Sequence, residues 1–351
     1  MREKIINFVV ILFAFVLGAF GMYYYIKQNT VETSSNISKS VTITSDDSIN
    51  ESIQKIYDSV VVVNNYRGGR LVGYGSGFVY KKDDKYGYIM TNNHVVEGAT
   101  EVKITLSNGD DVNAKVLGTD SYMDVAVVSI DVDDVKAVAE IGESTKSKIG
   151  DTVFTVGTPV SPDYAGTVTK GIISGENREI TVDNNGTSYM MEAIQIDASI
   201  NPGNSGGPLV NINGEVIGVN SVKLVENSVE GMGFAIPIEV AMSQVSKLEK
   251  GEIIDRPLIG VSTYDTSNAL LSSGGSEGIV VGSVQRDSDA EAAGLEQGDV
   301  IVKFDGIKVK SSAHLKFLLY KHNIGDTIKL TITRNGKEKE LSLKLTHKIG
   351  D

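Results

Sequence analysis

The sequence lacks cysteine and tryptophan, and only 4 of its 351 residues are histidine. Without cysteine the chain has no disulfide, no thiolate zinc site and no cysteine nucleophile. Acidic residues outnumber lysine and arginine by 45 to 33, and the formal net charge is −12. This balance opposes a nucleic-acid partner, because phosphate binding needs clustered basic side chains. We expect neither a metal ion nor another cofactor.

Most of the chain has a β-type pattern. Short apolar runs, such as residues 60–63, 77–80 and 125–128, alternate with turn signals from about residue 53 to residue 236. Many short strands at such spacing indicate an all-β sandwich or a pair of β-barrels. The predicted fold class is therefore mainly β.

The C-terminal part has a different pattern. Residues 238–249 have helical spacing, and a charged stretch follows them up to Arg256. The last hundred residues or so combine β-type runs with a helical pattern at residues 312–321, which predicts a small α+β domain. We expect His314 and His322 on the surface of this domain.

The N-terminal segment resembles a membrane anchor. Residues 5–26 contain no charged side chain, and Arg2 and Lys4 precede them. A helix of this length spans roughly 33 Å, enough to cross about 30 Å of hydrocarbon. The positive charges favour a cytoplasmic N-terminus, so the rest of the chain would be extracytoplasmic. The alternative is a cleaved signal peptide, although no clear small-residue cleavage site follows Gly21.

These patterns predict four segments. Residues 1–27 form a cytoplasmic stub and membrane anchor, and residues 28–48, which are rich in Ser, Thr, Asn and Asp, form a flexible linker. Residues 49–250 form the large β domain, and residues 251–351 form the small α+β domain.

The strongest chemical signal is a serine among glycines, Gly203-Asn204-Ser205-Gly206-Gly207. A serine hydroxyl becomes a nucleophile when a base takes its proton, and an acyl-transfer intermediate needs backbone N–H donors for its oxyanion. Glycines allow backbone angles and close approaches that other residues reach only with strain. The alternative is an ordinary glycine-rich turn.

The base follows by elimination, because His94 is the only imidazole before His314. It follows an apolar strand pattern, where a strand end can present a side chain to a cleft. The orienting acid is predicted to be Asp124, which precedes the apolar run at residues 125–130 and would hold the imidazole in one tautomer. Asp120 is the local competitor.

With these residues in place, the sequence resembles the HtrA/Deg family of serine proteases, which are trypsin-like enzymes with a C-terminal PDZ domain. The resemblance runs from about residue 53 to the C-terminus. Five motifs carry it: Thr91-Asn92-Asn93-His94-Val95-Val96, Asp124-Val125-Ala126-Val127, Gly203-Asn204-Ser205-Gly206-Gly207-Pro208-Leu209 with the preceding residues 197–202, Gly75-Ser76-Gly77-Phe78-Val79 and Gly233-Phe234-Ala235-Ile236-Pro237.

The resemblance implies a chymotrypsin-like double β-barrel with the triad in the cleft between the barrels. It makes Ser205 the nucleophile and His94 the general base, and it assigns the oxyanion hole to the backbone N–H groups of Gly203 and Ser205. The residue six before the nucleophile, Ser199, would lie at the base of the specificity pocket with Ile200 beside it. Since neither carries a charge, we expect small to medium apolar residues at P1.

Residues 256–345 resemble a single PDZ domain. Its carboxylate-binding loop is predicted to include Leu258, Ile259, Gly260 and Val261. An extended peptide would pair with the strand after Gly260, and its terminal carboxylate would bind backbone N–H groups of the loop. The helix at residues 312–321 would form the other wall, although each of its leucines is more readily explained as core.

The sequence thus predicts a membrane-anchored, extracytoplasmic bacterial serine endopeptidase that cleaves misfolded or regulatory proteins without ATP. Its expected partners are unfolded or membrane-associated protein substrates, C-terminal peptides bound by the PDZ domain, and the lipid bilayer. The resemblance also implies a homotrimer and control of activity through the PDZ domain. The alternatives are a proteolytically silent chaperone or PDZ scaffold, and an esterase that uses the same triad.

Overall fold

The structure is a computed structural model that describes residues 2–29, 47–158, 160–184, 187–221, 231–265 and 278–349. The chain divides into two compact units, Met1–Ser45 and Asp46–Asp351. Most of the predicted linker, residues 30–46, lies outside the described residues.

The first unit contains helix α1 (Arg2–Asn29). Within the described part of the chain, no helix meets the length and apolarity needed to cross a membrane.

The second unit begins with helix α2 (Asp47–Tyr57), which leads into a closed barrel in the order β1-β2-β3-β6-β5-β4. All pairings around this barrel are antiparallel. Alternate residues of each strand face the interior, which the valines and isoleucines of the predicted β runs fill. The six strands are β1 (Val60–Arg67), β2 (Arg70–Lys82), β3 (Tyr86–Thr91), β4 (Glu101–Thr105), β5 (Asp111–Asp120) and β6 (Val125–Asp131).

A second barrel follows. Its strands run in the order β11-β8-β9-β10-β13-β12, and a β11–β12 pairing closes the ring, while β7 adds to β12 outside it. The strands are β7 (Glu140–Ile141), β8 (Thr152–Gly157), β9 (Thr167–Asn184), β10 (Thr187–Ile196), β11 (Pro208–Asn211), β12 (Glu215–Asn220) and β13 (Gly233–Pro237). Short 3-10 helices occur at Val132–Asp134, Ser144–Lys146 and Pro162–Tyr164.

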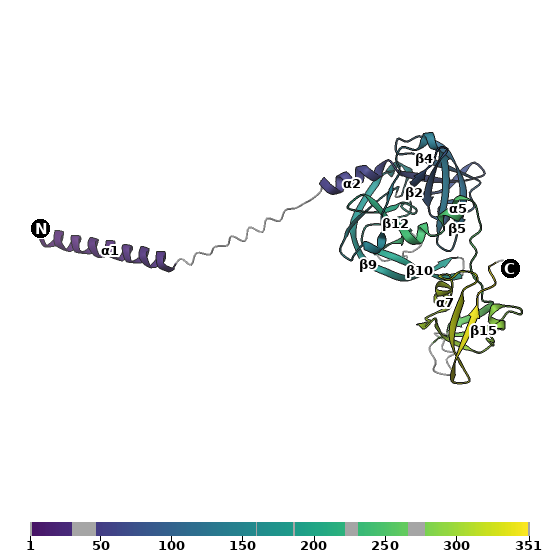
Figure 1. Cartoon of the computed structure of the whole chain (residues 1–351). Helices are drawn as coiled ribbons and strands as arrows, with labels where there is room; N and C mark the ends of the chain where they lie inside the picture. Colours follow the sequence, from purple (N-terminus) through teal and green to yellow (C-terminus); the bar gives the residue numbers. More distant parts are fainter. Residues whose placement is uncertain are drawn as a thin grey trace. The chain divides into compact units, whose positions relative to one another are not determined.

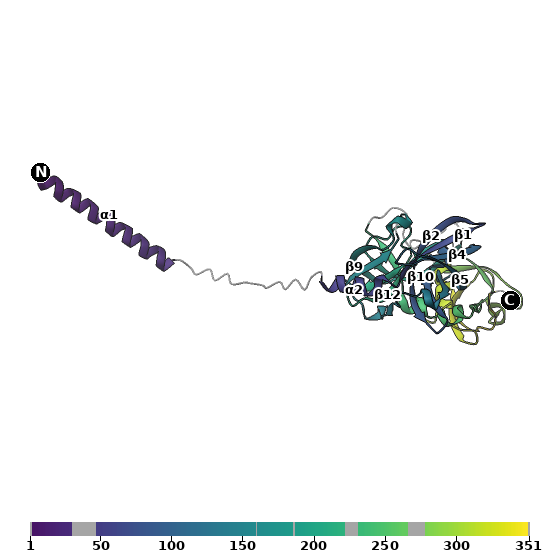
Figure 2. The same cartoon turned by 90° about the horizontal axis from the view of Figure 1, so that it is seen from above.

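One apolar cluster spans the two barrels, in addition to the cluster inside each. Phe78 and Met90 of the first barrel belong to the same buried cluster as Phe154 and Phe234 of the second. In both views β2, β4 and β5 lie on one side and β9 and β12 on the other (Figure 1 and Figure 2). The predicted double β-barrel is confirmed.

The predicted helix at residues 238–249 is two short helices, α4 (Ile238–Met242) and α5 (Val245–Glu249). The break falls at Ser243, whose Oγ donates a 2.7 Å hydrogen bond to the carbonyl oxygen of Val240. Such local side-chain bonds compete with the helical backbone pattern. The helical pattern is therefore present on both sides of an interruption at residues 243 and 244.

The last domain is a small antiparallel sheet with the strand order β14-β15-β16-β18-β19, and β17 pairs with β16. Helices α6 (Asp289–Ala292) and α7 (Ser312–Leu319) complete it, as predicted for an α+β domain. The strands are β14 (Val261–Asp265), β15 (Ile279–Val284), β16 (Val300–Phe304), β17 (Ile307–Lys308), β18 (Thr327–Arg334) and β19 (Lys337–Lys344).

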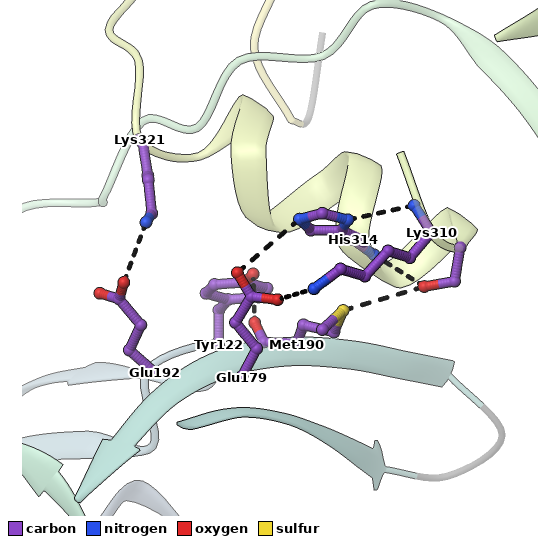
Figure 3. A network of polar contacts seen from close by, with 8 residues as sticks. Tyr122, Glu179, Met190, Glu192, Lys310, His314 and Lys321 are labelled. Carbon is purple, nitrogen blue, oxygen red and sulfur yellow. Dashed lines mark hydrogen bonds and ion pairs between the residues drawn. The ribbon is translucent and has the colours of Figure 1, made fainter. Parts of the chain in front are cut away.

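Helix α7 packs against strand β10 of the second barrel. Met190 of β10 is buried in the core cluster of the small domain. Ion pairs flank this contact: Lys310 is 2.5 Å from Glu179 and Lys321 is 3.1 Å from Glu192 (Figure 3). The hydrogen bond from Lys310 lowers the pKa of the Glu179 carboxyl.

His314 is buried in this contact, so the prediction that it lies on the surface was wrong. Its side chain faces β10 from α7, and its Nδ1 accepts the backbone N–H of Lys310 at 3.1 Å (Figure 3). Burial lowers the pKa of the His314 imidazole, because charging the ring inside the protein costs solvation. His322, in contrast, keeps 28% of its side chain exposed.

Candidate active site

His94 lies on a single helical turn, α3 (Asn93–Val96), just after strand β3. Its Nδ1 is 2.8 Å from Oδ2 and 3.0 Å from Oδ1 of Asp124, and its backbone N–H donates to Oδ1 at 3.0 Å. The carboxylate is 1% exposed and the imidazole 20%. An ionised carboxylate only accepts hydrogen bonds, so Nδ1 carries the proton and Nε2 is the basic nitrogen.

The Asp124 carboxylate is held from several directions. Ser221 Oγ donates to Oδ2 at 2.9 Å. The backbone of the same residue is held too, because the Asn92 side-chain amide donates to the backbone carbonyl oxygen of Asp124 at 2.8 Å. Asp124 has a φ of 53°, in the left-handed region that few residues other than glycine adopt. Asp120, the competing candidate, instead accepts the backbone N–H groups of Tyr122 and Met123.

The loop that carries Ser205 packs against the strand before His94. The carbonyl oxygen of Ser205 accepts the N–H of Ser76 at 2.8 Å, and the N–H of Gly206 donates to the backbone carbonyl oxygen of Asn220 at 2.9 Å. Gly206 has a φ of 84°, and a Cβ there would collide with Thr91 Oγ1 and with the carbonyl oxygen of Ser76. Only glycine therefore allows this approach, which brings the serine loop beside the residues that lead into α3.

Hydrogen bonds also fix the orientation of two amides in this loop. The carbonyl oxygen of Pro202 accepts the N–H of Val160 at 2.9 Å, and that of Asn204 accepts the N–H of Gly207 at 3.0 Å. In a trans peptide the N–H points away from the C=O, so these bonds set the directions of the Gly203 and Ser205 N–H groups. Val160 has a φ of 66°, an uncommon conformation for a β-branched residue.

The two predicted pocket residues lie just before this loop. Ser199 is exposed, and its carbonyl oxygen accepts a 3.0 Å hydrogen bond from Thr169 Oγ1. Ile200 is half-buried and packs on the core of the second barrel. A Cβ on Gly233 would lie 2.8 Å from Ile200 Cγ1, so the isoleucine directly covers strand β13 at its start.

The predicted PDZ loop lies at the start of β14, the edge strand of its sheet. The carbonyl oxygens of Ile259 and Gly260 accept the N–H groups of Ala290 and Gln285, both within the domain. The N–H groups of Gly260 and Val261 therefore point the opposite way. Leu258 uses its own N–H to bond the carbonyl oxygen of His347. Gly260 has a φ of 79°, which suits glycine at this turn.

Sequence reasoning missed two serines at the site. Ser221 contacts Asp124 from a position 97 residues away. Ser76 donates to the carbonyl oxygen of Gly203 at 2.8 Å and accepts the N–H of Thr158 at 3.0 Å. Ser76 lies within a motif of the family resemblance, but no local pattern predicts either contact. Among the described residues, no group of three or more His, Asp and Glu could hold a metal ion.

Two antiparallel barrels with a histidine–carboxylate pair beside a glycine-lined serine loop define a trypsin-like serine protease. Family models agree: residues 75–219 match the trypsin-like peptidase domain, and residues 257–345 match the PDZ domain.

The chain belongs to the HtrA family of Do-like serine proteases. It is 44% identical over 282 residues to the serine protease Do-like HtrB of Bacillus subtilis, covering 77% of this chain and 62% of that protein. It is 38% identical over 360 residues to the HtrA of Lactococcus lactis subsp. cremoris, covering 92% of this chain and 88% of that one.

Solved structures show the same likeness. The serine endoprotease from Yersinia pestis is 31% identical, with a TM-score of 0.66 over 86% of this chain and 98% of its own. The HtrA-type protease AlgW with a decapeptide is 28% identical, with a TM-score of 0.68 over 85% of this chain and 98% of its own.

The close packing at Gly206 gives a test of the site. We expect Gly206→Ala to lower peptidase activity by roughly 100-fold or more, because the loop must move to make room for the methyl group. The matched control is Gly109→Ala, since Gly109 has a similar φ of 87° with no atom within 4 Å of the added Cβ. The control incurs only the backbone strain, about 1–2 kcal/mol, and should keep its kcat. Equal kinetics in the two variants would contradict this account of the loop.

Proposed function

We propose that this protein is an endopeptidase in which Ser205 is the nucleophile, His94 the general base and Asp124 the orienting acid. The contact of His94 Nδ1 with the buried Asp124 carboxylate, at 2.8 Å, carries this proposal. It presents Nε2 as the base and stabilises the imidazolium that forms when the serine proton is taken. The Ser205 oxygen then attacks the scissile carbonyl, and the His94 imidazolium gives its proton to the leaving amine as the C–N bond breaks, which leaves the acyl-enzyme. His94 next takes a proton from the water that hydrolyses this ester and returns it to Ser205.

We assign the oxyanion hole to the N–H groups of Gly203 and Ser205. Support comes from the bonds that hold the preceding carbonyl oxygens, on Pro202 and Asn204. Donors fixed before the reaction stabilise the developing negative charge without having to reorient.

We assign the P1 contacts to Ser199 and Ile200. Neither residue carries a charge, so a lysine or arginine side chain entering a closed pocket would lose its hydration without gaining a partner. Small to medium apolar side chains fit best.

We propose that the PDZ domain regulates this activity by binding C-terminal peptides. Among the described strands β14 lies at the edge of its sheet, where an additional strand can pair, and the outward N–H groups of Gly260 and Val261 can donate hydrogen bonds to a carboxylate. We propose that the substrates are misfolded or regulatory proteins, which the enzyme cleaves without ATP. We also propose that it acts as a homotrimer, as the family resemblance implies.

We also propose that α1 anchors the chain in a bacterial membrane, with the catalytic domain extracytoplasmic. Its described large apolar side chains, among them Leu12, Phe13, Phe15 and Phe20, are all more than half exposed. A helix that exposes large apolar side chains needs an apolar environment to cover them.

Casein digestion tests the catalytic assignment. The full-length chain should degrade unfolded casein, and Ser205→Ala should lower the rate by roughly 10⁴-fold or more. Ser107→Ala, which removes only an exposed hydrogen bond to Asp58, is the control and should match the wild type. If wild type and Ser205→Ala leave casein equally intact while both suppress its aggregation, the protein is a chaperone or scaffold. Mass spectrometry of the new C-termini should show Ala, Val or Leu at P1.

Peptide binding tests the PDZ assignment. Peptides with an apolar C-terminal residue should bind the full-length chain, as measured by fluorescence anisotropy. The same peptides with an amidated C-terminus should bind about 10- to 100-fold more weakly, because hydrogen bonds to a charged group are lost. Equal affinity for both forms would rule out carboxylate recognition.

Membrane fractionation tests the anchor. The chain should remain in bacterial membranes after alkaline carbonate extraction, with an intact mass that includes α1. A released protein whose mass lacks the first residues would instead identify a cleaved signal peptide.

A further inference from the structure

Asp120, which the catalytic scheme does not use, is a buried carboxylate at the end of β5. Its Oδ1 accepts the backbone N–H groups of Tyr122 and Met123, at 3.0 and 3.1 Å. The next residue along the chain is Asp124. Oδ1 of Asp120 therefore stabilises the short turn that places the Asp124 carboxylate beside His94.

The other carboxylate oxygen of Asp120 binds an arginine at the start of the PDZ domain. Arg256 Nη2 lies 2.6 Å from Oδ2, and the two side chains are 13% and 1% exposed. The guanidinium carbon also lies 4.8 Å from the ring centre of Tyr122 and 5.4 Å from that of Tyr320. Arg256 thus contacts the turn at two residues, Asp120 and Tyr122.

The backbone of Arg256 is attached to the PDZ domain. Its carbonyl oxygen accepts the N–H of Ile349 at 2.9 Å, and the neighbouring Pro257 forms a β-bridge with Lys348. Tyr320, which immediately follows α7, meets the Tyr122 ring edge-on with the centroids 4.6 Å apart. Arg256 and Tyr320, which both contact the turn at residues 120–124, therefore belong to the PDZ domain.

Tyr122 has a further bond that fixes its ring. Its hydroxyl donates to the carbonyl oxygen of Met190 at 2.8 Å, below α7 (Figure 3). The turn is thus held by β10, by Asp120 and by the PDZ domain at once. Such constraint from several sides is what allows Asp124 to keep its left-handed φ of 53°.

We propose that Arg256 is a positioning residue, through which the PDZ domain holds the turn at residues 120–124 and so orients Asp124 toward His94. The inference rests on the catalytic roles proposed above for Asp124 and His94. It gives the PDZ domain a direct mechanical connection to the acid of the triad. A shift of Arg256 would move Asp120 and Tyr122, and through them the Asp124 carboxylate.

The alternative is a purely structural ion pair, and the chain offers two controls for it. Arg334 binds Asp299 through two 2.7 Å contacts, and Asp299 is also 1% exposed, but this pair lies within the PDZ domain. Arg334→Ala therefore also leaves a buried carboxylate unpaired. Lys321→Ala breaks an ion pair between the two domains, with Glu192, that does not touch the turn.

The experiment measures kcat and KM of full-length variants on a peptide with an apolar P1 residue. We expect Arg256→Ala to lower kcat about 10- to 100-fold, as a small misplacement of a catalytic group does, with KM changed less than about threefold. Arg256→Lys, which keeps the charge, should recover much of the loss. Arg334→Ala and Lys321→Ala should keep kcat within about threefold of the wild type.

A spectroscopic measurement tests the contact without relying on turnover. The chain has only 4 histidines, so labelling them with ¹⁵N gives few signals, and a His94→Asn variant assigns the one of interest. We expect the low-field Nδ1–H resonance of His94 to shift or broaden in Arg256→Ala and to stay in place in Arg334→Ala. This readout holds even if the wild type cleaves no peptide, an outcome that would reject the proposed function alone.

A double variant covers the case in which Arg256→Ala does not fold. Asp120→Asn combined with Arg256→Met removes both charges, so no buried charge is left unpaired, and the asparagine oxygen can still accept the two turn N–H groups. We expect it to fold and to show the lowered kcat. Wild-type kcat and an unchanged His94 resonance in this double variant would overturn the proposal.

Discussion

The structure depends on placing one negative charge, that of Asp124, inside the protein. A carboxylate that is 1% exposed is tolerated only when donors surround it, and here the imidazole, a backbone N–H and a serine hydroxyl all do so. These donors come from α3 in the first barrel and from the end of β12 in the second. The charge therefore fixes how the barrels meet as well as the tautomer of His94.

The loop that carries Ser205 is held in place by hydrogen bonds to its backbone, without a buried charge. Ser76, Asn220 and Val160 each bond a different peptide unit of the loop. Glycine at position 206 allows the loop to lie against β3, and no side chain could fill that position without moving it. The geometry of the serine loop thus follows from close packing, in which each backbone carbonyl that is held in place orients the amide after it.

The sequence predicts the double barrel, the α+β domain and the residues whose local motifs are distinctive. His94 follows an apolar strand pattern and Asp124 precedes one, so their placement at strand ends can be derived from pattern alone, whereas Ser205 is marked by the glycines around it. Contacts between distant segments have no such signal: Ser221 meets Asp124 from 97 residues away, and Arg256 meets Asp120 from 136. Burial of His314 was missed for the same reason, because the face of α7 that β10 covers is defined only by the packing of the two domains.

Met190 shows that the covalent boundary between the domains is not the boundary between their cores. This methionine belongs to a strand of the second barrel, yet its side chain is buried among the apolar residues of the PDZ domain. A cut after residue 250 would leave it, together with the carboxylates of Glu179 and Glu192, on a newly exposed face. The two domains therefore share part of their folding free energy.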